Sequence, residues 1–288
     1  MSVVFRVIPH DVPSLQALHS PAVFSELIQR PSGLILVTGP TGSGKTLSLY
    51  SCLDLLNRPE INISTVEDPS EIHLPGANQV NINERAGLTF AASIRALLRQ
   101  DPDVIMVGEI RDLETADVAI QAAQTGHLVL STLHTNDAPS TLARLRHMGI
   151  AAFNVAASAG LITAQRLVRR LCHQCKYAIS GQEYDVFFKH LCPQDTQALR
   201  PRQLTNASLF QARGCDACDN GYKGRIGLYQ VMPVSDAMRT LIMRDCDTQA
   251  LASQAAREGI RTLRQAGLVK VLQGITTMEE VLAHTPHA

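Results

Sequence analysis

The sequence predicts an open α/β fold with a mostly parallel sheet, a small cysteine-rich module and a helical C-terminal region. Three observations support this prediction. Short apolar strands alternate with helical segments up to residue 148, a glycine-rich turn joins one of these strands to the next helix, and two C-x-x-C pairs follow where the alternation stops. Strands that alternate with helices usually pair in parallel, and the helices then cover both faces of the sheet.

The predicted elements follow from the spacing of apolar residues. In chain order, strands are expected at 3–8, 33–38, 61–66, 104–107, 128–132 and 226–231, and helices within 14–30 and at 46–56, 89–99, 113–124 and 139–148. The most apolar stretch, 150–171, is interrupted by asparagine, glutamine and arginine residues, and we expect a buried or half-buried helix there. Thr277 and Glu280 predict a capping box for the last helix.

The composition indicates a folded chain without a membrane span. Of its 288 residues, 45% are hydrophobic and 18% are charged, which is enough for a sizeable core. No stretch offers the roughly 20 apolar residues of a spanning helix, and the N-terminus lacks the pattern of a signal peptide. The formal net charge of zero argues against a nucleic-acid partner. We therefore expect a cytoplasmic protein, whose seven cysteines suggest metal ligation before disulfides.

A phosphate-binding loop is predicted between the strand 33–38 and the helix that follows it. The pattern G-x-x-x-x-G-K-[ST] is matched by Gly39, Pro40, Thr41, Gly42, Ser43, Gly44, Lys45 and Thr46. The backbone N–H groups of such a loop face phosphate oxygens, and the helix opening adds the positive end of its dipole. Lys45 would reach the β- and γ-phosphates, and the Thr46 hydroxyl would ligate Mg²⁺. An ordinary glycine turn accounts less well for strand, loop and helix together.

Two acidic segments are predicted at the carboxyl ends of neighbouring strands, where open α/β sheets bind their ligands. One is 65–71, which contains Glu67 and Glu71, and the other is 101–112, in which an apolar strand leads to Glu109 in the Walker B form. A nucleotide hydrolase needs one carboxylate to orient the attacking water and another near the metal. Acidic loop residues are usually only solvated, so this prediction depends on the phosphate loop upstream.

Two histidines, His127 and His134, flank the predicted strand 128–132. A lone histidine is most often structural. This pair could instead lie near the terminal phosphate as sensors or polar clamps. The spacing leaves both interpretations open.

Two C-x-x-C pairs predict a metal site. Cys172 and Cys175 form one pair, Cys215 and Cys218 form the other, and 39 residues separate them. Each pair brings two thiolates to one ion, and two pairs complete a tetrahedral Cys₄ site, so we expect a structural Zn²⁺. A catalytic zinc would need an open coordination position, and a redox C-x-x-C would need a thioredoxin-like context.

Together these segments resemble the ATPase family that drives type II secretion and type IV pilus assembly. The matching stretches, in order, are LVTGPTGSGKT, STVEDPSEI, RALLRQDPDVIMVGEIRDLETA and AAQTGHLVLSTLHTNDA. They correspond to the family's Walker A loop, Asp box, atypical Walker B strand and His box. The resemblance implies ATP and Mg²⁺ as ligands, Glu71 as the general base, Glu109 as the Walker B acid and His134 as a γ-phosphate contact.

The resemblance also implies a division of the chain and a set of partners. Residues 1–22 would be the remnant of a preceding domain and its linker, 23–170 a RecA-like ATPase core, 171–222 a tetracysteine zinc-binding module and 223–288 a helical C-terminal region. Family members form hexamers that act on an inner-membrane platform protein. We therefore expect a location peripheral to that membrane, without direct contact to nucleic acid. The cysteine module is typical of assembly and export ATPases rather than of pilus-retraction motors.

The chain departs from the family pattern at its N-terminus, where members carry further domains that supply arginines to a neighbour's nucleotide. The sequence is compatible with a fragment of a longer protein and with a naturally short homologue. An arginine finger is worth about 10³–10⁵ in rate, so we expect intact ATP binding but weak hydrolysis and poor ring formation by this chain alone. A nucleotide-binding scaffold with little hydrolysis is the alternative function. A zinc-containing NTPase that binds nucleic acid is disfavoured by the neutral charge.

Overall fold

The computed structural model describes residues 12–179 and 209–286, so the predicted strand at 3–8 lies outside the described residues. The larger sheet has seven strands in the order β3-β2-β4-β5-β1-β6-β9. All neighbouring pairs in it run parallel except β6 and β9. This confirms the predicted fold class. The strands are β1 Gly33–Thr38, β2 Ile63–Glu67, β3 Asn78–Asn81, β4 Val104–Val107, β5 Leu128–Leu133, β6 Ala159–Leu171 and β9 Tyr222–Pro233.

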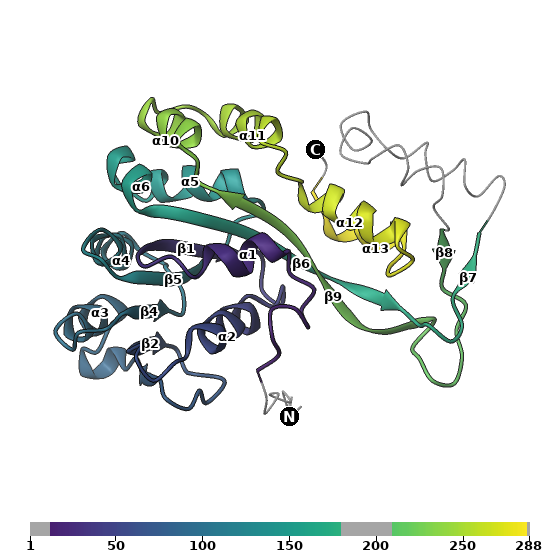
Figure 1. Cartoon of the computed structure of the whole chain (residues 1–288), viewed down its shortest axis with the longest axis horizontal. Helices are drawn as coiled ribbons and strands as arrows, with labels where there is room; N and C mark the ends of the chain where they lie inside the picture. Colours follow the sequence, from purple (N-terminus) through teal and green to yellow (C-terminus); the bar gives the residue numbers. More distant parts are fainter. Residues whose placement is uncertain (1–11, 180–208, 287–288) are drawn as a thin grey trace.

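Helices cover both faces of this sheet, as Figure 1 shows. In β1, Leu34 and Leu36 belong to the core on the side of α3 to α6, whereas Ile35 and Val37 belong to the core on the side of α1 and α2. Successive side chains of a strand point to opposite faces, so a wholly apolar strand needs a core on each side. The helices are α1 Ala22–Leu27, α2 Lys45–Leu56, α3 Phe90–Leu97, α4 Leu113–Gln124, α5 Ala138–His147 and α6 Ala152–Ser158.

Most of the elements predicted between residues 33 and 148 are confirmed to within two residues at each end. The helix expected within 14–30 is confined to α1, which begins directly after Pro21. Strand β3 was not predicted, because its sequence Asn-Gln-Val-Asn carries a single apolar side chain. It forms the edge of the sheet next to β2, where a polar strand is tolerated.

The prediction of a helix over residues 150–171 is wrong. Only the short α6 is helical there, and the remainder forms β6, a 13-residue strand between β1 and β9. Its first eight residues are all buried, so they lack the alternation that marks a half-buried strand. The polar residues also have partners: Gln165 Oε1 accepts a hydrogen bond from Ser48 Oγ at 2.8 Å, and the Arg166 guanidinium donates to Asn136.

Strand β9 is longer than predicted and pairs antiparallel with β6 from Leu161 opposite Pro233 to Leu171 opposite Tyr222. Although it follows the cysteine segment in sequence, β9 completes the sheet of the first part of the chain. In Figure 1, β6 and β9 extend past the other strands of the sheet, toward the short antiparallel pair β7 (Tyr177–Ala178) and β8 (Phe210–Gln211). The first cysteine pair directly follows β6, and the second lies shortly before β9.

The helical C-terminal region is confirmed. Two of its helices, α12 and α13, pack against β6 and β9, as Figure 1 also shows. No helix in residues 12–179 and 209–286 is long and apolar enough to cross a membrane. The helices are α10 Asp236–Met243, α11 Thr248–Arg257, α12 Leu263–Leu272 and α13 Met278–His284.

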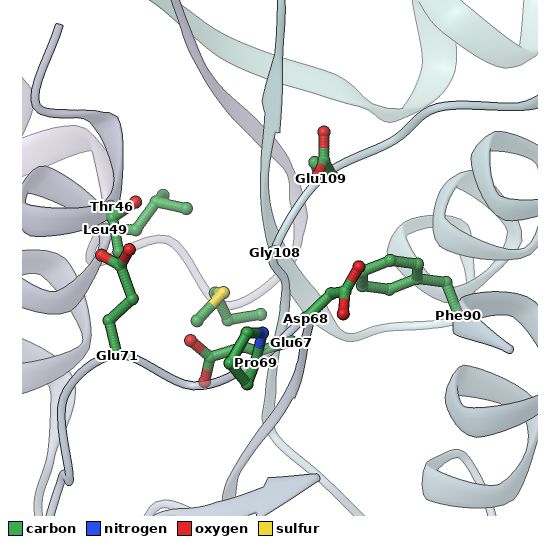
Figure 2. Close-up of a pocket in the computed structure, with 10 residues that line it drawn as sticks. Thr46, Leu49, Glu67, Asp68, Pro69, Glu71, Phe90, Gly108 and Glu109 are labelled. Atoms are coloured by element: carbon green, nitrogen blue, oxygen red, sulfur yellow. The ribbon is translucent and has the colours of Figure 1, made fainter. Parts of the chain in front are cut away.

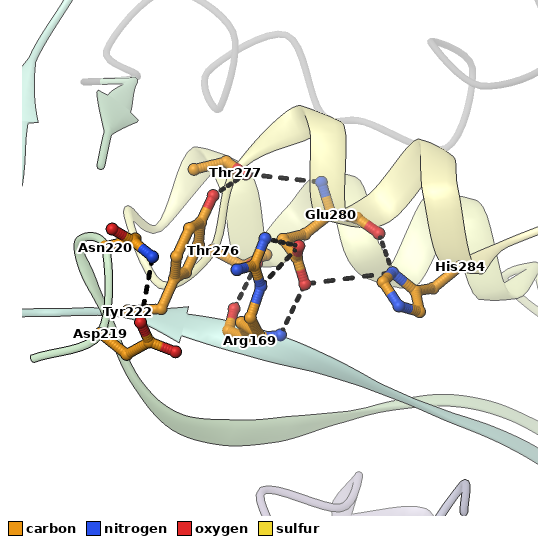
Figure 3. Close-up of polar contacts among 8 residues, drawn as sticks. All are labelled: Arg169, Asp219, Asn220, Tyr222, Thr276, Thr277, Glu280 and His284. Carbon is orange, nitrogen blue, oxygen red and sulfur yellow. Dashed lines mark hydrogen bonds and ion pairs between the residues drawn. The ribbon is translucent and has the colours of Figure 1, made fainter. Parts of the chain in front are cut away.

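A buried carboxylate attaches α13 to β6 (Figure 3). Glu280 accepts hydrogen bonds from the backbone N–H of Arg169 at 2.8 Å and from its guanidinium at 2.6 and 2.9 Å. The guanidinium also lies 4.0 Å from the centre of the Tyr222 ring. Thr277 caps α13 as predicted, but Glu280 does not return the bond of a capping box because its carboxylate is taken up by Arg169. Burial raises the pKa of Glu280, the bonds from Arg169 outweigh this, and the net shift is downward.

We predict that Glu280→Ala lowers the free energy of unfolding by about 2 kcal/mol, the contribution of a hydrogen bond to a charged group. The pKa of Glu280 is lower in the folded state, so its stabilisation is complete above the unfolded pKa and is lost as pH falls through the folded pKa. Urea unfolding at neutral and acidic pH should therefore show that Glu280→Gln costs less in acid. Glu279→Ala, at an exposed neighbour, is the control and should change little.

Candidate functional site

The predicted site residues meet at one edge of the sheet, as the parallel arrangement requires. Strands β1, β2, β4 and β5 all end there, so the phosphate loop, the 65–71 segment and the loop after β4 converge. Figure 2 shows the cleft between them. It is lined by Thr46, Leu49, Glu67, Asp68, Pro69, Glu71, Phe90, Met106, Gly108 and Glu109.

The phosphate loop has the conformation that an anion cradle needs. Gly39 has φ of 150°, and a Cβ at this position would lie 2.5 Å from the carbonyl oxygen of Gln165. Gly44, with φ of 87°, is the N-cap of α2 and offers no side-chain cap. Among helices of eight or more residues in the described part of the chain, α2 differs in this from the others, which begin at a capping serine, threonine or aspartate. Its first amides are therefore available to a phosphate.

Lys45 places a cation at the mouth of this loop. Its Nζ donates to the carbonyl oxygens of Gly39 at 2.9 Å and Pro40 at 3.0 Å. Burial lowers the pKa of Lys45, the negative charge of Glu109 raises it, and the positive charge of Arg166 lowers it. The ammonium group is thus partly desolvated, which strengthens its attraction to phosphate oxygens relative to that of a lysine in bulk water.

Glu109 lies beyond the end of β4, next to an arginine and a histidine. Arg111 donates a hydrogen bond to its Oε1 and lies 3.8 Å from Asp68, while His134 Nε2 is 3.6 Å from its Oε2. The bond from Arg111 lowers the pKa of Glu109, burial opposes this, and His134 assists, with a net downward shift. The carboxylate is therefore ionised at neutral pH. The sequence predicts no role for Arg111, whose contact with Glu109 is visible only in the structure.

Two further carboxylates, Glu67 and Glu71, come from the end of β2 and the segment after it. In the view of Figure 2 the Glu71 carboxylate points toward the start of α2, where Thr46 lies. Glu67 is 4% exposed and accepts hydrogen bonds from Tyr50 and Thr65, both at 2.7 Å. The sequence placed Glu67 in the acidic segment without a role, since its burial could not be known in advance.

The two histidines do not act as a pair. His134 follows β5 at the cleft, whereas His127 precedes β5 at the opposite end of the strand. His127 Nδ1 is 3.0 Å from the carbonyl oxygen of Ala122 and 3.2 Å from Thr125 Oγ1. The ring therefore hydrogen-bonds to the C-terminal end of α4. For His127 the structure therefore supports the structural interpretation.

The four predicted cysteines come together far from the phosphate loop, at the outer end of β6 and β9. All four Sγ atoms of Cys172, Cys175, Cys215 and Cys218 lie within 4.8 Å of one another. Three of the separations are 3.6, 3.7 and 4.0 Å. Sulfurs held at 2.3 Å around a tetrahedral zinc would be about 3.8 Å apart. The cluster therefore fits a metal site closed by four thiolates.

Comparison with known proteins identifies the family. The Type II/IV secretion system protein family matches residues 3–283. The chain belongs to this family. This confirms the resemblance deduced from the four motifs.

The relatives that match this chain include pilus assembly and secretion ATPases. The type IV pilus assembly ATPase PilB of Acinetobacter baylyi is 52% identical over 260 residues, which are 90% of this chain and 44% of that protein. The type II secretion system ATPase E of Vibrio cholerae is 47% identical over 270 residues, which are 93% of this chain and 51% of that protein. The chain spans about half the length of the curated relatives it matches.

Two solved structures share the fold of this chain over most of its length. The pilus retraction motor PilT with bound ADP matches with a TM-score of 0.72 and 30% sequence identity, over 96% of this chain and 68% of that one. The Legionella pneumophila ATPase DotB matches with a TM-score of 0.70 at 23% identity, over 96% of this chain and 66% of that one, which supports the fold.

We predict that Gly39→Ala destabilises the protein more than Gly42→Ala. Both glycines have positive φ, but the added Cβ at Gly39 would meet a backbone oxygen, whereas nothing lies within 4 Å of one at Gly42. We expect a loss of about 1 kcal/mol at Gly42 from backbone strain alone and of about 3 kcal/mol at Gly39, where overpacking adds to it. Urea unfolding measures both, and equal losses would contradict the crowding at Gly39.

Proposed function

We propose that the chain is an ATP-binding and ATP-hydrolysing motor subunit of a type IV pilus assembly or type II secretion machine. One observation carries the proposal. The uncapped start of α2, with Lys45 beside it, faces the same cleft as the carboxylates Glu71 and Glu109. An anion cradle next to carboxylates is the arrangement that phosphoryl transfer to water requires.

Each group has a role that follows from its position. The loop amides and Lys45 would hold the β- and γ-phosphates, and His134 would contact the γ-phosphate. Thr46 would ligate Mg²⁺ with Glu109 on the same side, and the bound ion supplies charge neutralisation at the phosphate oxygens. Glu71 would orient the attacking water and accept its proton. The protein thus contributes mainly positioning and preorganised charge.

For the cysteine cluster we propose a structural Zn²⁺ bound by Cys172, Cys175, Cys215 and Cys218. The spacing of the sulfur atoms supports this, and four thiolates leave no open position for a substrate. The ion would bring together two loops that lie 39 residues apart in sequence. It would also fix the outer end of β6 and β9, because Cys172 N–H donates to the carbonyl oxygen of Gly221 just before β9.

The proposed assembly is a hexamer that contacts an inner-membrane platform protein from the cytoplasmic side, with no direct binding of nucleic acid. Support comes from the family and from the pilus and secretion ATPases that match the chain at similar identity. Assembly is favoured over retraction, since PilB matches at 52% identity and PilT at 30%. The division into segments 1–22, 23–170, 171–222 and 223–288 is part of the same proposal, with β9 as the part of the last segment that pairs with the core sheet.

We predict that the chain binds Mg-ATP and that binding and hydrolysis depend on different residues. Lys45→Ala should weaken binding at least about tenfold, because it removes the charge at the phosphate loop. Glu71→Gln should keep the affinity and lower the hydrolysis rate about 100-fold or more, as loss of a general base does. Affinity is measured by fluorescent-nucleotide titration, and hydrolysis by phosphate release under single-turnover conditions.

The outcomes of this experiment separate the alternatives. Tight binding without hydrolysis in the unaltered chain would support the nucleotide-binding scaffold. Absence of binding at millimolar Mg-ATP would contradict both proposals. A turnover unchanged by Glu71→Gln would contradict its role as the base.

We predict about one zinc per chain and its loss in Cys215→Ser, because three thiolates hold the ion less tightly. Metal content is measured by mass spectrometry after gel filtration. Cys246→Ser is the matched control, since Cys246 lies outside the cluster and is also a free thiol. Equal zinc content in the two variants would contradict the proposed site.

A further inference from the structure

A buried polar network lies directly beneath the cleft and is centred on Glu67, the last residue of β2. Its Oε2 accepts a hydrogen bond from Tyr50 Oη at 2.7 Å. Its Oε1 accepts one from Thr65 Oγ1 at 2.7 Å and a longer one from Gln79 Nε2 at 3.4 Å. Both oxygens of the carboxylate are therefore occupied by protein donors, which limits its use as a proton acceptor.

Tyr50 connects this network to the phosphate loop. It lies in α2, four residues after Thr46, and therefore about one helical turn along the same face. The residue is wholly buried, and its ring packs in the core between α2 and the sheet. Burial, followed by the hydrogen bond and charge of Glu67, raises the pKa of Tyr50 well above its usual value, so its hydroxyl stays protonated and donates.

Gln79 connects the network to the segment that carries Glu71. Its Nε2 donates to Tyr50 Oη at 3.0 Å and to the carbonyl oxygen of Ile72 at 2.9 Å. Its Oε1 accepts from the backbone N–H of Leu74 at 2.9 Å. One side-chain amide on β3 thus holds two backbone groups just after Glu71, in a stretch that belongs to no helix or strand.

We propose that Tyr50, Glu67 and Gln79 form a positioning network that fixes Glu71 relative to Thr46. The connection runs from Thr46 along α2 to Tyr50, through Gln79 to the backbone of Ile72, and so to Glu71. Glu67 anchors it by accepting from Tyr50, whose hydroxyl oxygen in turn accepts from Gln79. The proposal rests on the proposed function, in which Glu71 orients the attacking water. A misplacement of about 1 Å can cost about 100-fold in rate, so such a support is expected to matter.

Two conservative variants test the network. Gln79→Leu keeps the approximate volume of the side chain and removes its contacts to Ile72 and Leu74. Tyr50→Phe removes only the hydroxyl and keeps the buried ring. We expect each to lower the single-turnover rate of Mg-ATP hydrolysis about 10-fold to 100-fold while the affinity for Mg-ATP changes less than about 3-fold. Asn78→Ala is the matched control on the same strand, because Asn78 is exposed and its side chain donates to Asn62.

A double-mutant cycle with Glu71→Gln separates positioning from general stability. If Gln79 acts through Glu71, then Gln79→Leu should slow the Glu71→Gln variant less than about 3-fold further. Effects that multiply in full would overturn the proposal, because Gln79 would then act independently of Glu71. Equal losses in affinity and rate, in step with a lower unfolding temperature, would also overturn it by showing a merely structural network.

Hydrogen exchange gives a readout that does not require ATP. The Leu74 amide donates to Gln79, so Gln79→Leu should raise its exchange rate about tenfold or more in the nucleotide-free protein. Unchanged exchange over residues 71–75 would overturn the network itself. Faster exchange in a chain that neither binds nor hydrolyses Mg-ATP would support the contacts and contradict the proposed function instead.

Discussion

The free amides at the start of α2 are the constraint on which the site depends. This helix begins at a glycine with positive φ, and no side chain caps it. Buried or half-buried amides without acceptors are costly, and a bound anion is the natural acceptor at a helix start. The loop before it can take this shape because Gly39 passes within reach of the backbone of Gln165, where no Cβ would fit.

Strand β6 joins the phosphate loop to the rest of the molecule. It pairs with β1 next to the loop, and its Gln165 side chain accepts from Ser48 in α2. Six residues later the same strand reaches Leu171, directly before the first cysteine pair. Between them, Arg169 binds Glu280 of α13. A single continuous strand therefore connects the phosphate loop, the cysteine cluster and the C-terminal helices.

The sequence was sufficient for the parts of the structure that depend on local pattern. The phosphate loop, the apolar strand 104–107 and the cysteine pairs are each read from a few neighbouring residues, and the structure brings the members of each together. The error at β6 has a different origin. A strand buried on both faces has no alternation, and its arginines and glutamine are explained only by partners distant in sequence. The hydrogen-bond network around Glu67 could not be predicted from the sequence for the same reason, because Tyr50 and Gln79 contact Glu67 only in the folded structure.

Two carboxylates of the cleft, Glu109 and Glu67, differ in burial and therefore in how firmly their contacts hold them. The Arg111–Glu109 pair is partly exposed, with 56% and 23% of the two side chains accessible, so it adds at most about 1 kcal/mol. The hydrogen bond from Arg111 lowers the pKa of Glu109 and so favours its ionised form. Glu67, by contrast, is buried among protein donors, and removing the Tyr50 hydroxyl would take away the donor to its Oε2. The cleft thus combines a partly exposed carboxylate, Glu109, with a buried one, Glu67, and this difference in burial supports the proposed roles of Glu109 in ligand binding and of Glu67 in positioning.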